Sequence, residues 1–387
     1  MLNSPIAPWP NYSEAEAKIV TDVLKSNKVN YWTGTQGREF EKEFADYTGV
    51  SHAIAVANGT LALELALRAI DIQPGDEVIV TSRSFMASAS SIVVQGGTPV
   101  FADVEKNSQN VSARTIEKVI TDKTKAIICV HLAGWMCEMD AICQLAEKKN
   151  LWVIEDCAQA HGASYKNKKA GSWGHINAFS FCQDKIMTTA GEGGMVTTNN
   201  KELWKKAWAY KDHGKSYDAV YNNQHPPGFR WLHESFGSNW RLTEIQSAVG
   251  RYQLKLLDSW VEERRNNAKT YSTTLAEFPA VRLTQPDEDV YHSYYKYYFF
   301  IDPQELAQDW TQDKLIEALN KEGLPAFSGS CSEMYLEKAF EHFQQPVLPN
   351  AHELSQASYM LLVHPGITNA QMAKMQSALT KVLKQAL

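Results

Sequence analysis

Long apolar runs are missing from this sequence. The best candidate, Ile127–Cys137, contains His131 and falls short of the roughly 20 residues that cross a bilayer. Residues 1–10 lack a basic segment followed by an apolar core, so no secretion signal is expected. The six cysteines form no Cys-x-x-Cys pair, which together with the missing signal predicts reduced thiols. We therefore expect a cytoplasmic protein without a membrane segment.

An excess of positive charge is also missing. The chain has 38 Lys and Arg against 44 Asp and Glu, a formal charge of −6. This balance gives no general attraction to nucleic acid or to acidic membranes. Hydrophobic residues make up 44% and charged residues 21%, which excludes a disordered chain. At roughly 150 residues per domain, the 387 residues predict two domains or three.

The first 160 residues contain a series of short, continuous apolar runs. Runs of this kind, without polar alternation, are typical of strands that are buried on both faces. Their spacing of about 21 to 28 residues suits strand–helix–strand crossovers. We predict an α/β fold with a mostly parallel sheet. The strands are expected at Ala53–Ala57, Val78–Val80, Pro99–Phe101, Ile127–Val130 and Trp152–Ile154, and the helices at Leu61–Ile70, Phe85–Val94, Ala113–Ile120 and Met139–Lys149.

The pattern changes after about residue 200 and predicts a smaller α/β unit in the last third. An irregular stretch, Gly214–Asn239, separates two long helical stretches. An aromatic run further along predicts a single strand. We expect a large domain over residues 1–255 and a smaller C-terminal domain over residues 256–387. The helical stretches are Lys201–Lys211 and Arg241–Ala276, the strand is Tyr291–Ile301, and further helices are expected at Gln312–Lys321 and Asn369–Lys384.

The most informative chemistry lies between Val153 and Val196. An apolar strand ends in Glu155 and Asp156, and ligands of parallel sheets bind at the carboxyl ends of the strands. Lys185 follows in a glycine-rich segment. A carboxylate and a lysine in this arrangement indicate a Schiff-base cofactor, with the acid holding a pyridinium nitrogen protonated and the lysine forming the imine.

A second segment supplies the third feature of such a site. Asn58-Gly59-Thr60 ends a buried strand and opens a helix. The backbone N–H groups at a helix N-terminus attract phosphate, and the Thr60 hydroxyl adds a donor. A phosphate site, a pyridine-nitrogen acid and an amine together predict pyridoxal 5'-phosphate (PLP).

Motifs along nearly the whole chain resemble the DegT/DnrJ/EryC1/StrS family of sugar aminotransferases, within the fold-type-I PLP enzymes. The resemblance implies a large domain with a sheet of the seven-stranded type, flanked by helices, and a smaller α/β C-terminal domain. The motifs are Asn58–Leu63, Pro74–Val78, Glu155–Gly162, Phe179–Phe181 before Lys185, Gly191–Gly194, Asn239–Arg241 and His364–Gly366.

The resemblance also implies roles for single residues. Lys185 and Asp156 are the expected catalytic pair, Gln159 is expected near the phenolic oxygen of the cofactor, and Phe85 is expected to stack on its ring. Asn239 is expected to reach the phosphate of the neighbouring subunit, which implies a homodimer with shared active sites. The expected phosphate-binding residues are Gly59, Thr60, Leu61 and Ser180.

The implied reaction moves an amino group from L-glutamate to a keto or aldehydo sugar, for surface polysaccharide or lipopolysaccharide biosynthesis. The acceptor is a nucleotide-linked sugar, or a sugar acid such as oxidised 3-deoxy-octulosonate. Related deoxysugar dehydratases carry histidine where this chain has Lys185, which favours transamination. The alternatives are a PLP-dependent sugar dehydratase or epimerase, and a regulatory protein with the same fold.

Two segments depart from the family pattern. Cys182-Gln183-Asp184 replaces the more usual small, prolyl or asparaginyl residues before Lys185, and the loop 215–238 is longer than typical. Within that loop, Arg230 and His233 are candidate substrate residues, and Phe229 and Trp231 could pack on a sugar or a base. A dimer contact is the alternative for the same loop.

One group of residues could suggest a metal site. Cys129, His131 and Cys137 offer three possible ligands but lack the paired spacing of structural zinc sites. Buried strands commonly contain such residues as packing. We therefore expect no metal.

Overall fold

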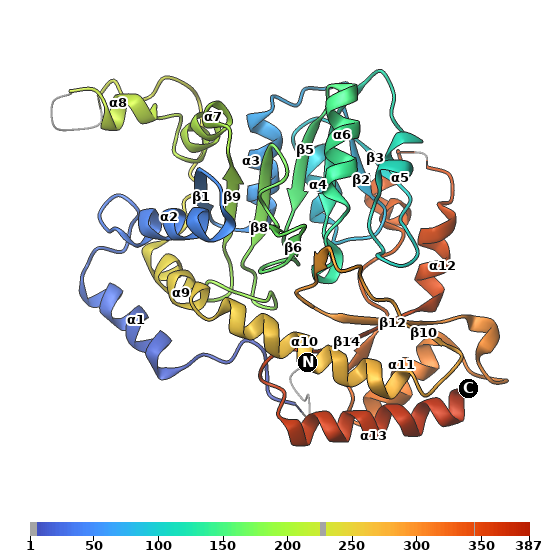
Figure 1. The fold of residues 1–387 in the computed structure, drawn as a ribbon. Coiled ribbons are helices and arrows are strands. Elements are labelled where there is room, and N and C mark those ends of the chain that lie inside the picture. The colour runs from blue at the N-terminus through green and yellow to red at the C-terminus, as the bar shows by residue number, and fades with distance from the viewer. Residues whose placement is uncertain (1–5, 225–229, 344) are drawn as a thin grey trace.

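The computed structural model in Figure 1 describes residues 6–224, 230–343 and 345–387. Its largest feature is a seven-stranded sheet in the order β1-β9-β8-β5-β4-β2-β3. β3, β2, β4, β5 and β8 pair in parallel, and β9 runs antiparallel to β8 and β1. The strands are β1 (His52–Val56), β2 (Glu77–Thr81), β3 (Thr98–Ala102), β4 (Thr124–Val130), β5 (Trp152–Asp156), β8 (Ile176–Ser180) and β9 (Gly194–Thr198). The predicted mostly parallel sheet and its first five strands are confirmed.

The strands of this sheet are mostly apolar because both faces are covered. Alternate residues enter two different hydrophobic clusters: Ile54 and Val56 belong to one, and Ala53 and Ala55 to the other. The first cluster includes residues of α3 (Gly59–Ala69), α4 (Ala87–Val94) and α7 (Lys201–Lys211). The second includes residues of α2 (Gln36–Thr48), α5 (Ala113–Glu117), α6 (Met139–Lys149) and α10 (Leu257–Leu275).

A second sheet lies in the C-terminal third, with strand order β10-β12-β14-β13 and antiparallel pairing throughout. It shares a third hydrophobic cluster with α10, α11 and α13, and α13 lies along α10 (Figure 1). The strands are β10 (Val281–Arg282), β12 (Tyr297–Ile301), β13 (Ala326–Phe327) and β14 (Ser358–Leu361), and the helices are α11 (Gln312–Lys321), α12 (Pro349–Ala357) and α13 (Asn369–Ala386). The predicted boundary at 255/256 falls between α9 (Glu244–Leu254) and α10 and stays a prediction.

The remaining elements are short or lie at the edges of the two sheets. A small sheet, β11-β6-β7, joins β6 (Ser164–Tyr165), β7 (Lys168–Lys169) and β11 (Val290–Tyr291). The helices not yet named are α1 (Glu14–Lys25), α8 (Tyr217–Tyr221) and the 3-10 turns η1 (Leu132–Gly134), η2 (Pro303–Glu305), η3 (Met334–Leu336) and η4 (Lys338–Phe340). None of the helices in the described ranges is long and apolar enough to cross a membrane.

Three sequence-based predictions need correction. The stretch Arg241–Ala276 forms two helices, α9 and α10, which are separated at residues 255–256 although no glycine or proline marks the break. The stretch Gly214–Asn239 is not irregular throughout, because α8 forms within it and the Ser216 side chain caps that helix by accepting the Ala219 N–H.

The third correction concerns Tyr291–Ile301, which is not one strand. Its first residue pairs in the small sheet, whereas β12 begins only at Tyr297. Between them, the N–H groups of Ser293 and Tyr295 donate to the carbonyls of Gly134 and Ala133. Tyr294 adopts a positive φ of 45°, which an extended strand does not allow. This bend brings Tyr295 toward the carboxyl ends of the large sheet.

Candidate active site

The residues predicted to bind the cofactor follow the ends of three strands of the large sheet. Asn58–Thr60 come after β1, Asp156 ends β5, and Ser180–Lys185 leave β8. In parallel sheets, this edge is where ligands bind.

Asp156 is a buried carboxylate, only 4% exposed. Its Oδ2 accepts the Ser88 hydroxyl at 2.7 Å, and its Oδ1 accepts the Ala158 N–H at 3.1 Å. Burial raises the pKa of Asp156, while these two hydrogen bonds and the charge of Lys185 act in the opposite sense. Within the described ranges no ion pair to this carboxylate is recorded. The side chain therefore suits a cationic partner such as a protonated ring nitrogen.

The start of α3 packs against the end of β8, and the site formed there by Gly59, Thr60 and Ser180 is called the cradle below. The Asn58 side chain caps the helix by accepting the Leu61 N–H at 2.9 Å. A Cβ on Gly59 would lie 2.4 Å from the Cβ of Ser180, so only glycine allows this close approach. The first-turn N–H groups of Gly59 and Thr60 have no carbonyl partner within the helix, which leaves them available to an anion. The predicted Leu61 contact would compete with Asn58 for the same N–H.

Lys185 lies in the segment between β8 and β9, with its side chain 16% exposed. Its Nζ is 3.5 Å from Asp184 Oδ1 and donates to the Tyr295 hydroxyl at 3.5 Å. Tyr295 also donates to Asp184 Oδ2. The carbonyl of Lys185 accepts the indole N–H of Trp9 at 2.7 Å. The lysine amine is thus held between a carboxylate and a phenol.

The other predicted cofactor residues occupy three positions around this edge. Phe85 is 70% exposed, and its carbonyl accepts the N–H of Ser88, which in turn contacts Asp156. Gln159 is buried, and its Oε1 accepts the Ala133 N–H at 2.8 Å. Asn239 is exposed, in a segment that pairs alongside the end of β1 through the hydrogen bond from Ala57 N–H to the carbonyl of Trp240.

The predicted substrate residues do not join this group within one chain. Arg230 and His233 are exposed, and among the described residues no hydrogen bond connects either side chain with Lys185 or Asp156. Phe229 lies outside the described residues. Sequence reasoning also missed Ser88 and Tyr295, because a serine within a helix and one tyrosine in an aromatic run carry no distinguishing signal.

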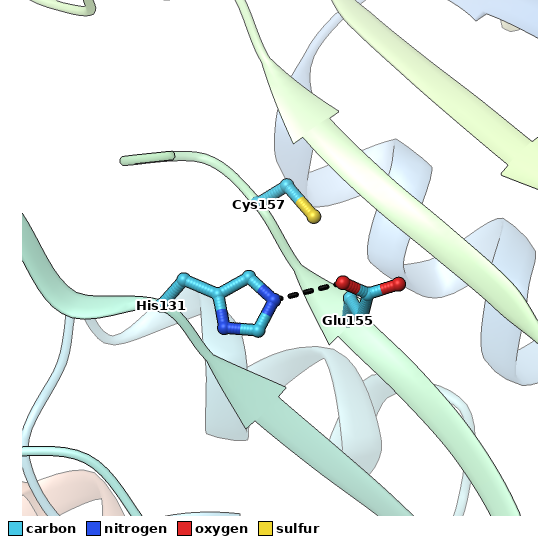
Figure 2. A group of neighbouring side chains, drawn as sticks. All are labelled: His131, Glu155 and Cys157. Carbon is cyan, nitrogen blue, oxygen red and sulfur yellow. Dashed lines mark hydrogen bonds and ion pairs between the residues drawn. The ribbon is translucent and has the colours of Figure 1, made fainter. Parts of the chain in front are cut away.

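A buried cluster beside Asp156 resembles a metal site, but its histidine and its carboxylate are engaged in hydrogen bonds. Figure 2 shows His131, Glu155 and Cys157, whose ligand atoms lie within 4.8 Å of one another. His131 Nδ1 accepts the Cys137 N–H at 3.1 Å, so Nε2 carries the proton that is donated to Glu155 at 2.9 Å.

Glu155 also binds three backbone groups. Its two oxygens accept the N–H groups of Gly171, Trp173 and Gly174 at 3.1, 2.7 and 2.8 Å. A metal would have to displace these bonds. The cluster therefore fixes the loop 171–174 against β5, next to Asp156.

Comparison with known proteins decides the family. Residues 10–380 match the profile of the DegT/DnrJ/EryC1/StrS aminotransferase family. The chain belongs to this family. It is 36% identical to the GDP-perosamine synthase of Escherichia coli O157:H7, over 94% of each chain. It is 39% identical to that of Caulobacter vibrioides, over 91% of this chain and 92% of the relative.

Solved structures agree with the family assignment. An aminotransferase from Psychrobacter cryohalolentis is 52% identical and superposes with a TM-score of 0.96, over 98% of this chain and 99% of that one. The predicted fold-type-I architecture, transaminase class and PLP cofactor are confirmed, and the chain is a sugar aminotransferase. The buried acid, the glycine cradle and the exposed Phe85 all fit PLP.

Changing Lys185 to alanine should abolish turnover, because it removes the amine that is expected to form the imine. The fold should stay intact, because the change removes a polar side chain and opens no core cavity. Borohydride treatment of the PLP-loaded wild type should add the mass of the reduced cofactor to the peptide that contains Lys185, and no such addition should occur in the variant. Transamination of glutamate by Lys185→Ala at the wild-type rate would disprove the assignment.

Asp156→Asn should retain PLP but lower the turnover number at least about a hundredfold, because a neutral amide does not hold the ring nitrogen protonated. Steady-state kinetics measure the turnover number, and the cofactor absorbance measures the retention of PLP. Activity within a few-fold of wild type would mean that another group performs this task.

Glu155→Gln should reduce the free energy of unfolding by about 2 to 5 kcal/mol, since the amide replaces a charged acceptor that three N–H groups and His131 share. Urea denaturation measures the change, and Glu288→Gln at an exposed acid serves as the control. Equal stability of the two variants would show that the network contributes little.

Proposed function

We propose that this sugar aminotransferase transfers an amino group from L-glutamate to the keto or aldehydo carbon of a nucleotide-linked sugar. The observation that carries the proposal is the pairing of a buried acid, Asp156, with an accessible amine, Lys185, at the same edge of the sheet. Both are needed for transamination. A lysine, rather than a histidine, at position 185 favours this reaction over dehydration.

Asp156, the cradle and Lys185 would each perform a different part of the reaction. PLP supplies an electron sink when bound. Asp156 would keep the ring nitrogen protonated, and the cradle at Gly59, Thr60 and Ser180 would hold the phosphate. The Nζ of Lys185 would remove the Cα proton of the donor and later return a proton, as general base and acid.

The contacts of Lys185 support this role. Asp184 and Tyr295 lie within reach of its Nζ in the structure, so the amine has polar partners that can hold it near the reacting carbon after it is released. Holding the amine near the reacting carbon lowers the entropic cost of reaching the reactive geometry.

The names of the relatives support the choice of acceptor class. Two of them are GDP-perosamine synthases, so GDP-linked keto sugars are the first acceptors to test. A sugar acid such as oxidised 3-deoxy-octulosonate is the second class. We place the reaction in the cytoplasm, in the biosynthesis of surface polysaccharide or lipopolysaccharide.

We further propose a homodimer in which Asn239 of one subunit reaches the phosphate bound by the other. Large aromatic side chains ahead of Asn239 are exposed in the single chain: Trp231 is 86% and Phe236 97% exposed. Exposed aromatics of this size are typical of interfaces.

The test of the proposed reaction uses glutamate labelled with ¹⁵N at the amino group. The PLP-loaded enzyme should form 2-oxoglutarate, and an added nucleotide-linked keto sugar should then be released as the amino sugar that carries the ¹⁵N label. Loss of water from the sugar without incorporation of nitrogen would instead indicate a dehydratase.

Arg230→Ala should raise the acceptor's apparent KM about tenfold or more and leave the half-reaction with glutamate nearly unchanged, since arginine binds phosphate or carboxylate bidentately. Stopped-flow measurement of each half-reaction separates the two effects. Equal damage to both half-reactions, or a shift from dimer to monomer in sedimentation, would assign Arg230 to the subunit interface.

A further inference from the structure

A chain of two serine hydroxyls ends on the carboxylate of Asp156. The Ser88 hydroxyl donates to Asp156 Oδ2 at 2.7 Å, and the hydroxyl oxygens of Ser84 and Ser88 are 2.9 Å apart. Both serines are buried, at 2% and 1% exposure. Among the described residues, neither hydroxyl makes a further hydrogen bond. The two hydroxyls therefore act on one group, the Asp156 carboxylate.

Main-chain hydrogen bonds hold both serines in place. Ser84 precedes α4, and its N–H donates to the carbonyl of Cys331 at 3.1 Å, in the C-terminal third of the chain. Ser88 lies in the first turn of α4, and its N–H donates to the carbonyl of Phe85 at 3.1 Å. These bonds do not involve the hydroxyls. A change from serine to alanine should therefore remove a hydroxyl and leave the backbone where it is.

Proton counting gives the hydroxyl chain a direction. A hydroxyl has one proton, and an ionised carboxylate can only accept. When Asp156 is ionised, Ser88 donates to it, so Ser84 is the donor to Ser88 and every proton has an acceptor. If Oδ2 of Asp156 carried a proton and donated it to Ser88, the direction would reverse. The Ser84 proton would then find no acceptor in the part of the chain that the structure describes. The chain therefore favours the ionised carboxylate, which is also the stronger acceptor.

This effect opposes that of burial. Burial raises the pKa of Asp156, and the hydrogen bond from Ser88 is the largest of the contributions that lower it. The other titratable groups next to this carboxylate are Lys185, His131 and Cys157. None of them is altered when a serine hydroxyl is removed, so the contribution of the hydroxyls can be measured separately.

We propose that Ser84 and Ser88 are positioning residues of the reaction: their hydroxyls keep Asp156 ionised, so that the proton stays on the ring nitrogen of bound PLP. A carboxylate that accepts a hydrogen bond is a weaker base, and a proton shared with the ring nitrogen then lies nearer the nitrogen. Both serines act through Asp156 and not on the cofactor itself. This inference rests on the proposed function, which assigns Asp156 its role.

The test measures the pKa of Asp156 in the protein without PLP, by ¹³C NMR of protein labelled at the side-chain carboxyl carbon of aspartate. The Asp156 signal is identified by its absence from Asp156→Asn. Ser88→Ala removes the donor, Ser84→Ala removes the outer hydroxyl, and Ser88→Thr keeps a hydroxyl at position 88. Ser91→Ala is the matched control, because Ser91 is also buried in α4 and its hydroxyl has no hydrogen-bond partner among the described residues.

Ser88→Ala should raise the pKa of Asp156, because the ionised form loses its donor while the carboxyl stays buried. Ser84→Ala should raise this pKa less, and Ser88→Thr and Ser91→Ala should leave it near that of the wild type. In the PLP-loaded enzyme, Ser88→Ala should lower the rate constant of each half-reaction about tenfold, as for the loss of a hydrogen bond to a charged group. The glutamate concentration that half-saturates the first half-reaction should stay nearly unchanged.

Equal pKa values of Asp156 in Ser88→Ala and in the Ser91→Ala control would overturn the proposal. An equal loss of rate in these two variants would also overturn it, since the effect would then come from the packing of α4. A raised pKa without any loss of rate would show that the hydroxyls do not serve the reaction. If Ser88→Ala shows no cooperative melting transition, Ser84→Ala decides.

The pKa measurement also separates this proposal from the proposed function. If the wild type shows no reaction with glutamate but the pKa of Asp156 still depends on Ser88, the hydroxyl chain is supported and the proposed donor is wrong.

Discussion

A carboxylate buried at the end of a strand is costly unless a cation meets it, and this constraint organises the site. Asp156 ends β5 inside the sheet, where Ser88 and the Ala158 N–H provide hydrogen bonds but no positive charge. We propose that a protonated ring nitrogen of bound PLP supplies that charge. The neighbouring Glu155 anchors the loop 171–174 by accepting three N–H groups, which holds the strand end in place.

The rest of the fold brings the partners of the cofactor to the same edge. At the end of β8, Ser180 lies against Gly59, and Lys185 follows in the segment between β8 and β9. Segments that are remote in sequence complete the surroundings of the amine: Trp9 comes from the N-terminal segment, and Tyr295 from the bend before β12. The lysine amine thus contacts a residue from the bend before β12, in addition to its neighbour Asp184.

Much of this could be predicted from the sequence because the signals are local. Continuous apolar runs predicted the first five strands of the large sheet, and α6, α7 and α11 begin and end where the helical pattern does. The break between α9 and α10 carries no glycine or proline, and the bend at Tyr294 depends on hydrogen bonds to Ala133 and Gly134 from another part of the chain.

We expect Asp156 to hold the ring nitrogen of PLP in its protonated form. The most direct measurement is the ¹⁵N chemical shift of that nitrogen in enzyme loaded with PLP labelled at the ring position, followed as the pH is raised from neutral into the alkaline range. A shift typical of a pyridinium ion is expected, and it should stay nearly constant over this range. A shift typical of neutral pyridine at neutral pH would contradict it.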